Sequence, residues 1–141
     1  MADTFTRERR SEIMSRIKST DTKPEIILRK KLYAQGYRYR INYKKLPGKP
    51  DIVLSKYRTV IFVHGCFWHG HESCKDAHLP KTNVAFWDKK INENINRDKK
   101  VVESLQQRGF NVLIVWECQL TPAKLSTTIA NITTILNETG Q

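Results

Sequence analysis

The stretch DIVLSKYRTVIFVH, residues 51–64, decides the fold. It holds two short apolar runs, at 51–54 and 59–63, on either side of the four residues Ser-Lys-Tyr-Arg. Apolar runs that flank a polar turn predict a β-hairpin, here one buried on both faces or nearly so. The stretch therefore supplies two neighbouring strands of the expected sheet.

The chain before this hairpin predicts two helices and a strand. Residues 7–18 place apolar side chains at helical spacing among basic ones, which indicates a short basic amphipathic helix. Pro24 stands in the first turn of a second helix, and Gly36 is placed to end it. The alternation over 37–43 (YRYRINY) predicts a strand.

The chain after the hairpin predicts a long helix, a strand and a closing helix. The helix spans about 84–107, with Val84 near its apolar face, and the strand covers 110–116. Trp116 lies in this apolar strand and is expected in the core. With the closing helix, over about 125–136, the order predicts a single α/β domain over residues 1–141, a small mixed sheet flanked by helices.

Composition points to an intracellular protein with a polyanionic partner. The formal net charge is +11, which favours nucleic acid over a basic surface kept for solubility. No apolar run approaches the ~20 residues of a spanning helix, and the start lacks a signal-like stretch. We therefore expect a cytoplasmic protein with no membrane association, monomeric by default.

Soft metal ligands cluster in one short stretch. The chain has three cysteines, an odd number that argues against a closed disulfide framework. All four histidines and two of the cysteines lie between residues 64 and 78. This density indicates a metal site, an active site, or both.

The hairpin geometry brings a second group of residues together. Asp51 begins one strand and His64 ends the next, so both are expected at one edge of the sheet. Glu25, in the first turn of the preceding helix, could reach the same place. A carboxylate, the backbone oxygen of Val63 and water are hard oxygen ligands of the kind that magnesium prefers.

Four stretches of the chain resemble a known nuclease family. Pro50-Asp51 at a strand start resembles the PD-(D/E)XK superfamily, although the partner strand ends Phe-Val-His and lacks the acidic-x-Lys pair. One branch fits: residues 46–51, 60–69, 86–87 and 112–118 resemble the very-short-patch-repair (Vsr) DNA mismatch endonucleases. The resemblance runs from about residue 9 to about 120 and implies a restriction-endonuclease-like fold with a structural zinc site.

The resemblance implies a magnesium-dependent centre. Asp51 and the Val63 carbonyl would hold Mg²⁺ on the scissile phosphate, and Glu25 would orient water at the metal. His69 would be the general base, since an imidazole pKa near 6.5 suits proton transfer at neutral pH. His64 would contact the phosphate or its water.

Two further interpretations concern the neighbours of these residues. Asp98, on the long helix, would polarise the His69 ring. Cys66, His71, Cys74 and Cys118 form a four-ligand set that suits a structural Zn²⁺. Family members have one residue between the loop histidine and cysteine where this chain has two, so His78 is kept as a substitute for Cys74.

Aromatic side chains beside cations suit insertion into a base stack. A wedge of this kind selects mispairs, because a mismatched step costs less to unstack. The resemblance implies that aromatic residues enter from the major groove, that two polar residues contact base edges, and that a methionine enters from the minor groove. The aromatic residues are Phe67, Trp68 and Trp87. The polar residues are Lys90 and Asn94, and the methionine is Met14.

The activity that the resemblance implies is nicking of double-stranded DNA 5′ of the T in a T:G mispair left by deamination of 5-methylcytosine. Mismatch-repair proteins would be further partners. Two alternatives stand beside it: a restriction-like nicking endonuclease without strict mismatch dependence, and a zinc-containing DNA-binding module without catalysis. Asp51, His64 and His69 at one edge argue against the module, because binding alone needs none of them.

Overall fold

The computed structural model describes residues 22–71, 74 and 81–139. The expected N-terminal helix at 7–18, including Met14, lies outside the described residues, and so does His78. Within the described part, no helix combines the length and apolarity that a membrane crossing needs.

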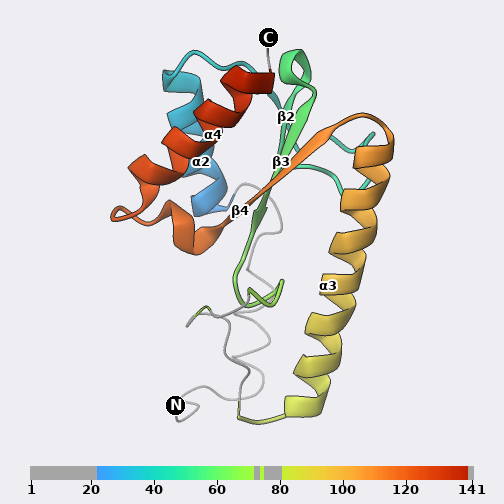
Figure 1. Cartoon of the computed structure of the whole chain (residues 1–141). Coiled ribbons are helices and arrows are strands. Elements are labelled where there is room, and N and C mark those ends of the chain that lie inside the picture. Colours follow the sequence, from blue (N-terminus) through green and yellow to red (C-terminus); the bar gives the residue numbers. More distant parts are fainter. Residues whose placement is uncertain (1–21, 72–73, 75–80, 140–141) are drawn as a thin grey trace.

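A four-stranded mixed sheet forms the centre of the molecule (Figure 1). Its strands are β1 (Arg40–Ile41), β2 (Ile52–Leu54), β3 (Thr59–His64) and β4 (Asn111–Trp116), which lie side by side in that order. The first three are antiparallel, with the 3₁₀ turn Ser55–Tyr57 closing the hairpin, and β4 is parallel to β3. The predicted α/β class, mixed sheet and central hairpin are confirmed.

Helices cover both faces of this sheet. Helices α2 (Lys23–Ala34) and α4 (Leu125–Thr139) pack on one face, and α3 (Val84–Gln107) lies along the other (Figure 1). Alternate residues of the hairpin serve the two layers: Ile61 packs with α2 and α4, and Phe62 packs with α3. Burial on both sides explains why the hairpin strands read as continuous apolar runs.

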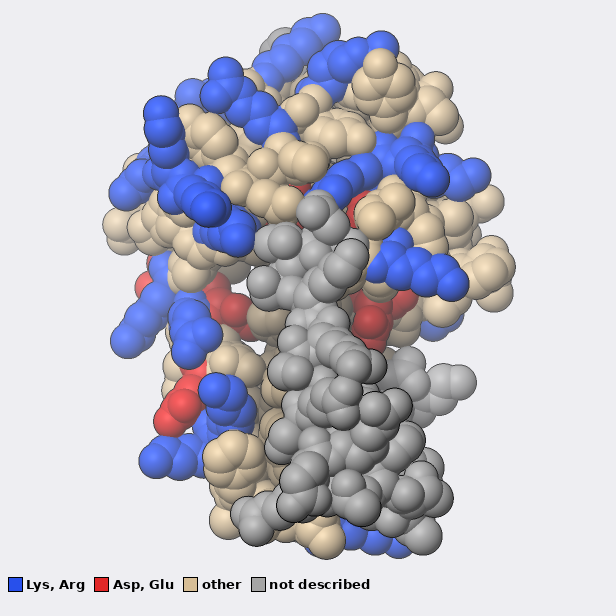
Figure 2. Space-filling view, turned by 180° about the vertical axis from the view of Figure 1, so that it is seen from behind, with Lys and Arg blue, Asp and Glu red and all other residues tan. Residues whose placement is uncertain are grey.

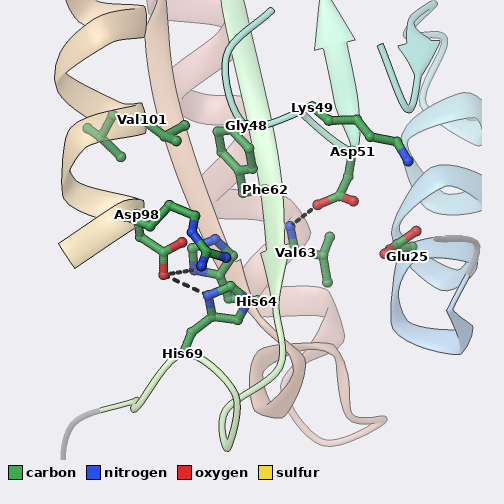
Figure 3. A pocket seen from close by; sticks show the side chains of 12 residues that line it. Glu25, Gly48, Lys49, Asp51, Phe62, Val63, His64, His69, Asp98 and Val101 are labelled. Carbon is green, nitrogen blue, oxygen red and sulfur yellow. Dashed lines mark hydrogen bonds and ion pairs between the residues drawn. The ribbon is translucent and has the colours of Figure 1, made fainter. Parts of the chain in front are cut away.

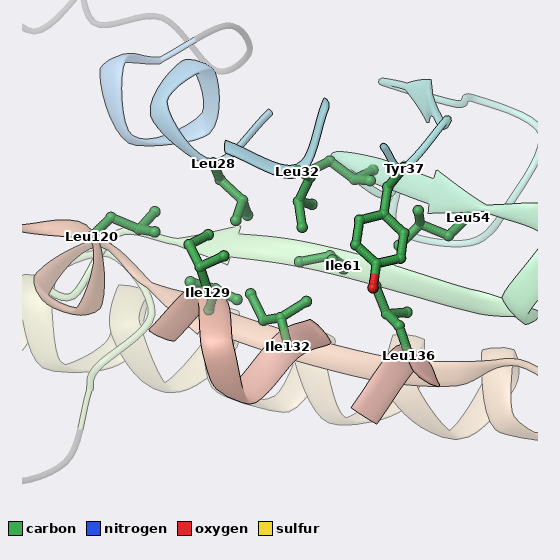
Figure 4. Packing of buried hydrophobic residues seen from close by; sticks show 11 residues of the cluster. Leu28, Leu32, Tyr37, Leu54, Ile61, Leu120, Ile129, Ile132 and Leu136 are labelled. Carbon is green, nitrogen blue, oxygen red and sulfur yellow. The ribbon is translucent and has the colours of Figure 1, made fainter. Parts of the chain in front are cut away.

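The larger core lies between α2, α4 and the sheet (Figure 4). Leu28 and Leu32 of α2 are fully buried there, against Ile132 and Leu136 of α4. The smaller core joins Leu105 of α3 to the opposite face of the hairpin. Together the two cores fix the ends of β2 and β3, where the candidate site lies.

The structure corrects three sequence predictions. The strand expected at 37–43 shrinks to Arg40–Ile41, because Tyr37 turns into the core and Asn42 takes a left-handed φ of +48°. Val84 is 48% exposed, since the first turns of α3 extend past the end of the sheet (Figure 1). Trp116 is only half-buried, and it packs between two histidines rather than in the core.

The parallel pairing of β3 and β4 determines which chain segments meet at the end of the sheet where both strands finish. A parallel neighbour needs a crossover, and α3 supplies it. The register pairs His64 with Trp116. The loop after β3 therefore lies beside the 3₁₀ turn Glu117–Leu120, which carries Cys118.

Candidate active site and metal centre

One cavity of about 280 Å³ brings the predicted catalytic residues together (Figure 3). It lies where β2 begins and β3 ends, between α2 and α3. Asp51, His64, His69 and Glu25 all line it, and so does Val63. The convergence expected from the hairpin geometry is therefore present.

Asp51 is held against the end of β3. The Val63 N–H donates to Asp51 Oδ2 over 2.6 Å. The N–H and C=O of one strand residue point to the same side, so the Val63 carbonyl also faces β2. Extending the β2–β3 register places Pro50 opposite Val63, and proline has no N–H to donate to that carbonyl. The local geometry thus places the Asp51 carboxylate and the Val63 carbonyl oxygen close together where β2 begins and β3 ends.

A second carboxylate shares the cavity with Asp51. Glu25 is only 3% exposed and pairs with Arg29 over 3.1 Å. Burial raises the pKa of Asp51 to about 7, the Val63 N–H opposes this rise, and the nearby Glu25 charge adds to it. The buried Glu25 carboxylate, the half-buried Asp51 carboxylate and a carbonyl oxygen form a donor set that suits a hard divalent cation.

His64, His69 and Asp98 form a group on the α3 side of the cavity (Figure 3). His69 Nδ1 lies 2.6 Å from Asp98 Oδ2, and His64 Nδ1 lies 4.0 Å from the same oxygen. The two imidazoles stack at 3.8 Å with an interplanar angle of 6°. Rings stacked in parallel cannot both hold one ion in their planes, so this group fits hydrogen bonding and proton transfer rather than chelation.

The electrostatics of the two histidines differ. Burial lowers the pKa of His64 to about 4; the His69 charge lowers it further, and Asp98 opposes the shift. His64 is therefore neutral near pH 7. His69 is more exposed, and its bond to Asp98 fixes the ring orientation.

A second cluster lies beside this cavity. Ligand atoms of Cys66, His71, Cys74 and Cys118 all lie within 4.8 Å of one another. His71 Nδ1 and Cys118 Sγ are 3.6 Å apart, close to the ~3.6 Å expected between a nitrogen and a sulfur on a tetrahedral zinc. Three thiols and one imidazole fit such a metal, and Cys74 lies with the other three ligand atoms. His78, the alternative to Cys74, lies outside the described residues.

The surrounding backbone and rings hold this cluster in place. The His71 N–H donates to the Cys66 carbonyl over 2.9 Å. The His71 ring stacks on Trp116 at 4.1 Å and 8°. Because His69 and His71 belong to the same short loop, a metal at the cluster would also fix the His69 backbone.

The aromatic residues predicted to form a wedge pack together. Phe67 lies 5.2 Å from Trp68 and 5.4 Å from Trp87, measured between ring centroids. Asn94 donates an amide N–H to the Trp68 carbonyl over 2.8 Å, so it also positions this loop. Lys90 is exposed on the same helix.

The sequence reasoning gave no catalytic role to two cations that line the same cavity, Lys49 and Arg97. Lys49 precedes Asp51 by two residues, and Arg97 directly precedes Asp98. Their closeness in sequence to Asp51 and Asp98 was the feature that could have predicted that both cations line the cavity.

A mixed sheet with a carboxylate and two imidazoles at the end of its central hairpin, beside a Cys/His cluster, defines a restriction-endonuclease-like α/β protein. The sequence profile of the family described as DNA mismatch endonuclease Vsr matches residues 2–75. The chain belongs to this Vsr family of DNA endonucleases, as its motifs predicted.

Relatives from several bacteria align over most of the chain. The type II nicking enzyme V.NmeAIP of Neisseria meningitidis serogroup A is 55% identical over 120 residues, which cover 85% of each protein. The type II nicking enzyme V.XorIIP of Xanthomonas oryzae is 44% identical over 85% of this chain and 88% of its own. DNA mismatch endonuclease Vsr of Escherichia coli is 45% identical over 85% of this chain and 76% of its own.

Proposed function

We propose that this protein nicks double-stranded DNA 5′ of the T in a T:G mispair, in very-short-patch repair of deaminated 5-methylcytosine, as a cytoplasmic monomer. The observation that carries the proposal is the meeting of Asp51, Glu25, His64 and His69 in one cavity of a Vsr-family fold. The E. coli relative is named a mismatch endonuclease.

Asp51 and the Val63 carbonyl would hold Mg²⁺ in this cavity. A bound magnesium ion supplies charge stabilisation at the phosphoryl oxygens and favours deprotonation of water. The support from the structure is the Val63–Asp51 bond, which holds the carboxylate against the end of β3, and the pKa of Asp51, which burial and the neighbouring Glu25 raise although Arg29 opposes the rise. Glu25 would orient water on the α2 side.

His69 would act as the general base. With its Nδ1 proton donated to Asp98, the imidazole presents Nε2 as an acceptor for the proton of the attacking water. Asp98 would hold this tautomer and stabilise the imidazolium that forms. His64, neutral and stacked on His69, would contact the phosphate.

The Cys66, His71, Cys74 and Cys118 cluster would hold a structural Zn²⁺. Structural zinc contributes on the order of 10 kcal/mol to the folding of small domains. Here it would join the loop that carries His69 to the end of β4. Its proposed role is to keep the general base in register with Asp51.

The DNA surface would combine the aromatic cluster with basic side chains. Phe67, Trp68 and Trp87 would open the stack at the mispair, and Lys90 and Asn94 would contact base edges. Met14 would approach from the minor groove. Lysines and arginines stand at many points over the described part of the face in Figure 2, in keeping with a partner that carries phosphates. Mismatch-repair proteins are proposed as further partners.

A second candidate function is nicking without strict mismatch dependence. The relatives in Neisseria and Xanthomonas are named type II nicking enzymes, which favours this alternative. It uses the same cavity and the same proposed chemistry, so only substrate selection separates the two functions.

One assay separates these functions and tests the proposed chemistry. The purified protein with Mg²⁺ is incubated with two duplexes that differ only in T:G or C:G at one position. Nicking of the mismatched duplex alone supports the first function, equal nicking supports the second, and no nicking of either refutes both. Asp51→Ala should abolish cutting and keep most binding, whereas Glu138→Ala, exposed on α4, should cut normally.

A further inference from the structure

Lys49 occupies an unusual place in the catalytic cavity. It lines the same space as Asp51, Glu25 and His69. In Figure 3 its side chain runs past Asp51 toward helix α2, which carries Glu25. Within the part of the chain that the structure describes, Lys49 forms no ion pair with either carboxylate.

The turn before Asp51 fixes where Lys49 can reach. The Lys49 N–H donates to the Leu46 carbonyl over 3.2 Å, and Gly48 takes a φ of +72°. This arrangement, with Pro47 and Gly48 in the central positions, is that of a type II turn. The buried Pro50 follows directly, so the Lys49 backbone is held on both sides.

Lys49 itself adopts a left-handed backbone, with a φ of +52°. Glycine and asparagine adopt this conformation more readily than lysine does. Strained residues of this kind gather at active sites, where the surrounding structure holds them for a purpose. Together with the turn before it, this conformation holds the Lys49 side chain at the cavity that Asp51 lines.

The cavity also lacks a cation on the hairpin itself. The PD-(D/E)XK pattern has a lysine on the partner strand, where this chain has Phe62-Val63-His64. We infer that Lys49 is a catalytic residue, whose ammonium group binds a non-bridging oxygen of the scissile phosphate and stabilises the charge that develops there. This inference rests on the proposed function and adds a residue to it.

The test uses Lys49→Asn, because asparagine removes the charge and suits the left-handed backbone. Its thermal midpoint should equal or exceed that of the wild type. Its single-turnover nicking rate should fall about 100-fold, the usual effect of losing one donor to a developing oxyanion. Lys49→Arg should recover part of that rate. Lys56→Asn, exposed in the turn at the other end of the hairpin, is the matched control and should cut normally.

A binding measurement gives a readout that is independent of cutting. Without added Mg²⁺, Lys49→Asn should bind the mismatched duplex about fivefold more weakly than the wild type, the scale of an exposed charge pair. The difference should vanish when a neutral methylphosphonate replaces the scissile phosphate. A difference that persists would show that Lys49 acts elsewhere on the DNA and would overturn the inference.

The outcomes for Lys49 and for the proposed function are distinct. Lys49→Asn cutting within about threefold of the wild-type rate overturns the role of Lys49 and leaves the proposed function intact. An equal loss in Lys56→Asn overturns it as well, since general electrostatics would then explain both. A wild-type protein that cuts neither duplex overturns the proposed function and this inference together.

Discussion

Gly70→Ala should disturb the active site through helix α3. Gly70 separates His69 from His71 and has a φ of +59°. A Cβ at this position would lie 2.8 Å from Ile91 Cγ2 and 2.8 Å from Ile95 Cδ1, where ordinary contact begins at 3.4 Å. The loop or the helix must therefore move by about 0.6 to 1 Å to restore normal packing.

The magnitude follows from two costs. A left-handed backbone costs an L-residue about 1–2 kcal/mol, and overpacking a well-filled site costs about 1–3 kcal/mol. Gly36→Ala supplies the control, because Gly36 is also left-handed at a φ of +95° but has nothing within 4 Å of its Cβ position. Gly70→Ala should thus unfold with a free energy about 1–3 kcal/mol lower than that of Gly36→Ala, measured by urea denaturation.

Activity should fall more steeply than stability. A displacement of ~1 Å at a catalytic group can cost about 100-fold in rate. Single-turnover nicking by Gly70→Ala, at a temperature where it stays folded, should drop by about that factor, while Gly36→Ala keeps the wild-type rate. Adding Ile95→Val removes one of the two crowded methyl groups and should restore part of both losses. If Gly70→Ala matched Gly36→Ala in both assays, the packing argument would be refuted.

Three further predictions concern metals, protons and the general base. Metal analysis should find about one zinc per chain. The variant Cys118→Ser should lose both the zinc and the nicking activity. Full zinc content in that variant would contradict the proposed ligand set. Because the pKa of Asp51 is raised to about 7, the folded protein binds a proton that the unfolded chain releases near pH 4. The free energy of unfolding of the metal-free protein should therefore fall as pH rises from about 4 to about 7, and Asp51→Asn should abolish this fall. Nicking that depends on Mg²⁺ should weaken as pH falls below 7, because protonated Asp51 is a poorer metal ligand. Asp98→Asn should lower the maximal nicking rate by up to about 10⁴-fold with little change in duplex affinity; a comparable loss of affinity would indicate a role in binding instead.

Much of this arrangement could be predicted from local patterns. The hairpin followed from two apolar runs on either side of a polar turn, and α3 followed from apolar side chains at helical spacing. The meeting of Asp51 and His64 followed from the antiparallel pairing of two adjacent strands. The strand at 37–43 was predicted too long, since alternation alone did not reveal that Asn42 turns the backbone into the left-handed region.

The remaining features depend on contacts between segments that are distant in sequence. Trp116 reads as a core residue in an apolar strand, but the β3–β4 register places it beside His64 and His71. Lys49 was missed because its role depends on a strained turn packed against α3. Gly48 faces Val101 there, at a distance that leaves no room for a Cβ atom.

The parallel crossover also sets the order in which the site can be completed during synthesis. Asp51, His64 and His69 leave the ribosome early, but Asp98 follows only with α3. Cys118, the last residue of the Cys/His cluster, follows after β4. A nascent or truncated chain that ends before residue 118 therefore carries these three side chains without the complete Cys/His cluster beside them. We therefore expect such a fragment to lack the proposed nicking activity, because the contacts that hold the His69 loop and its imidazole would be missing.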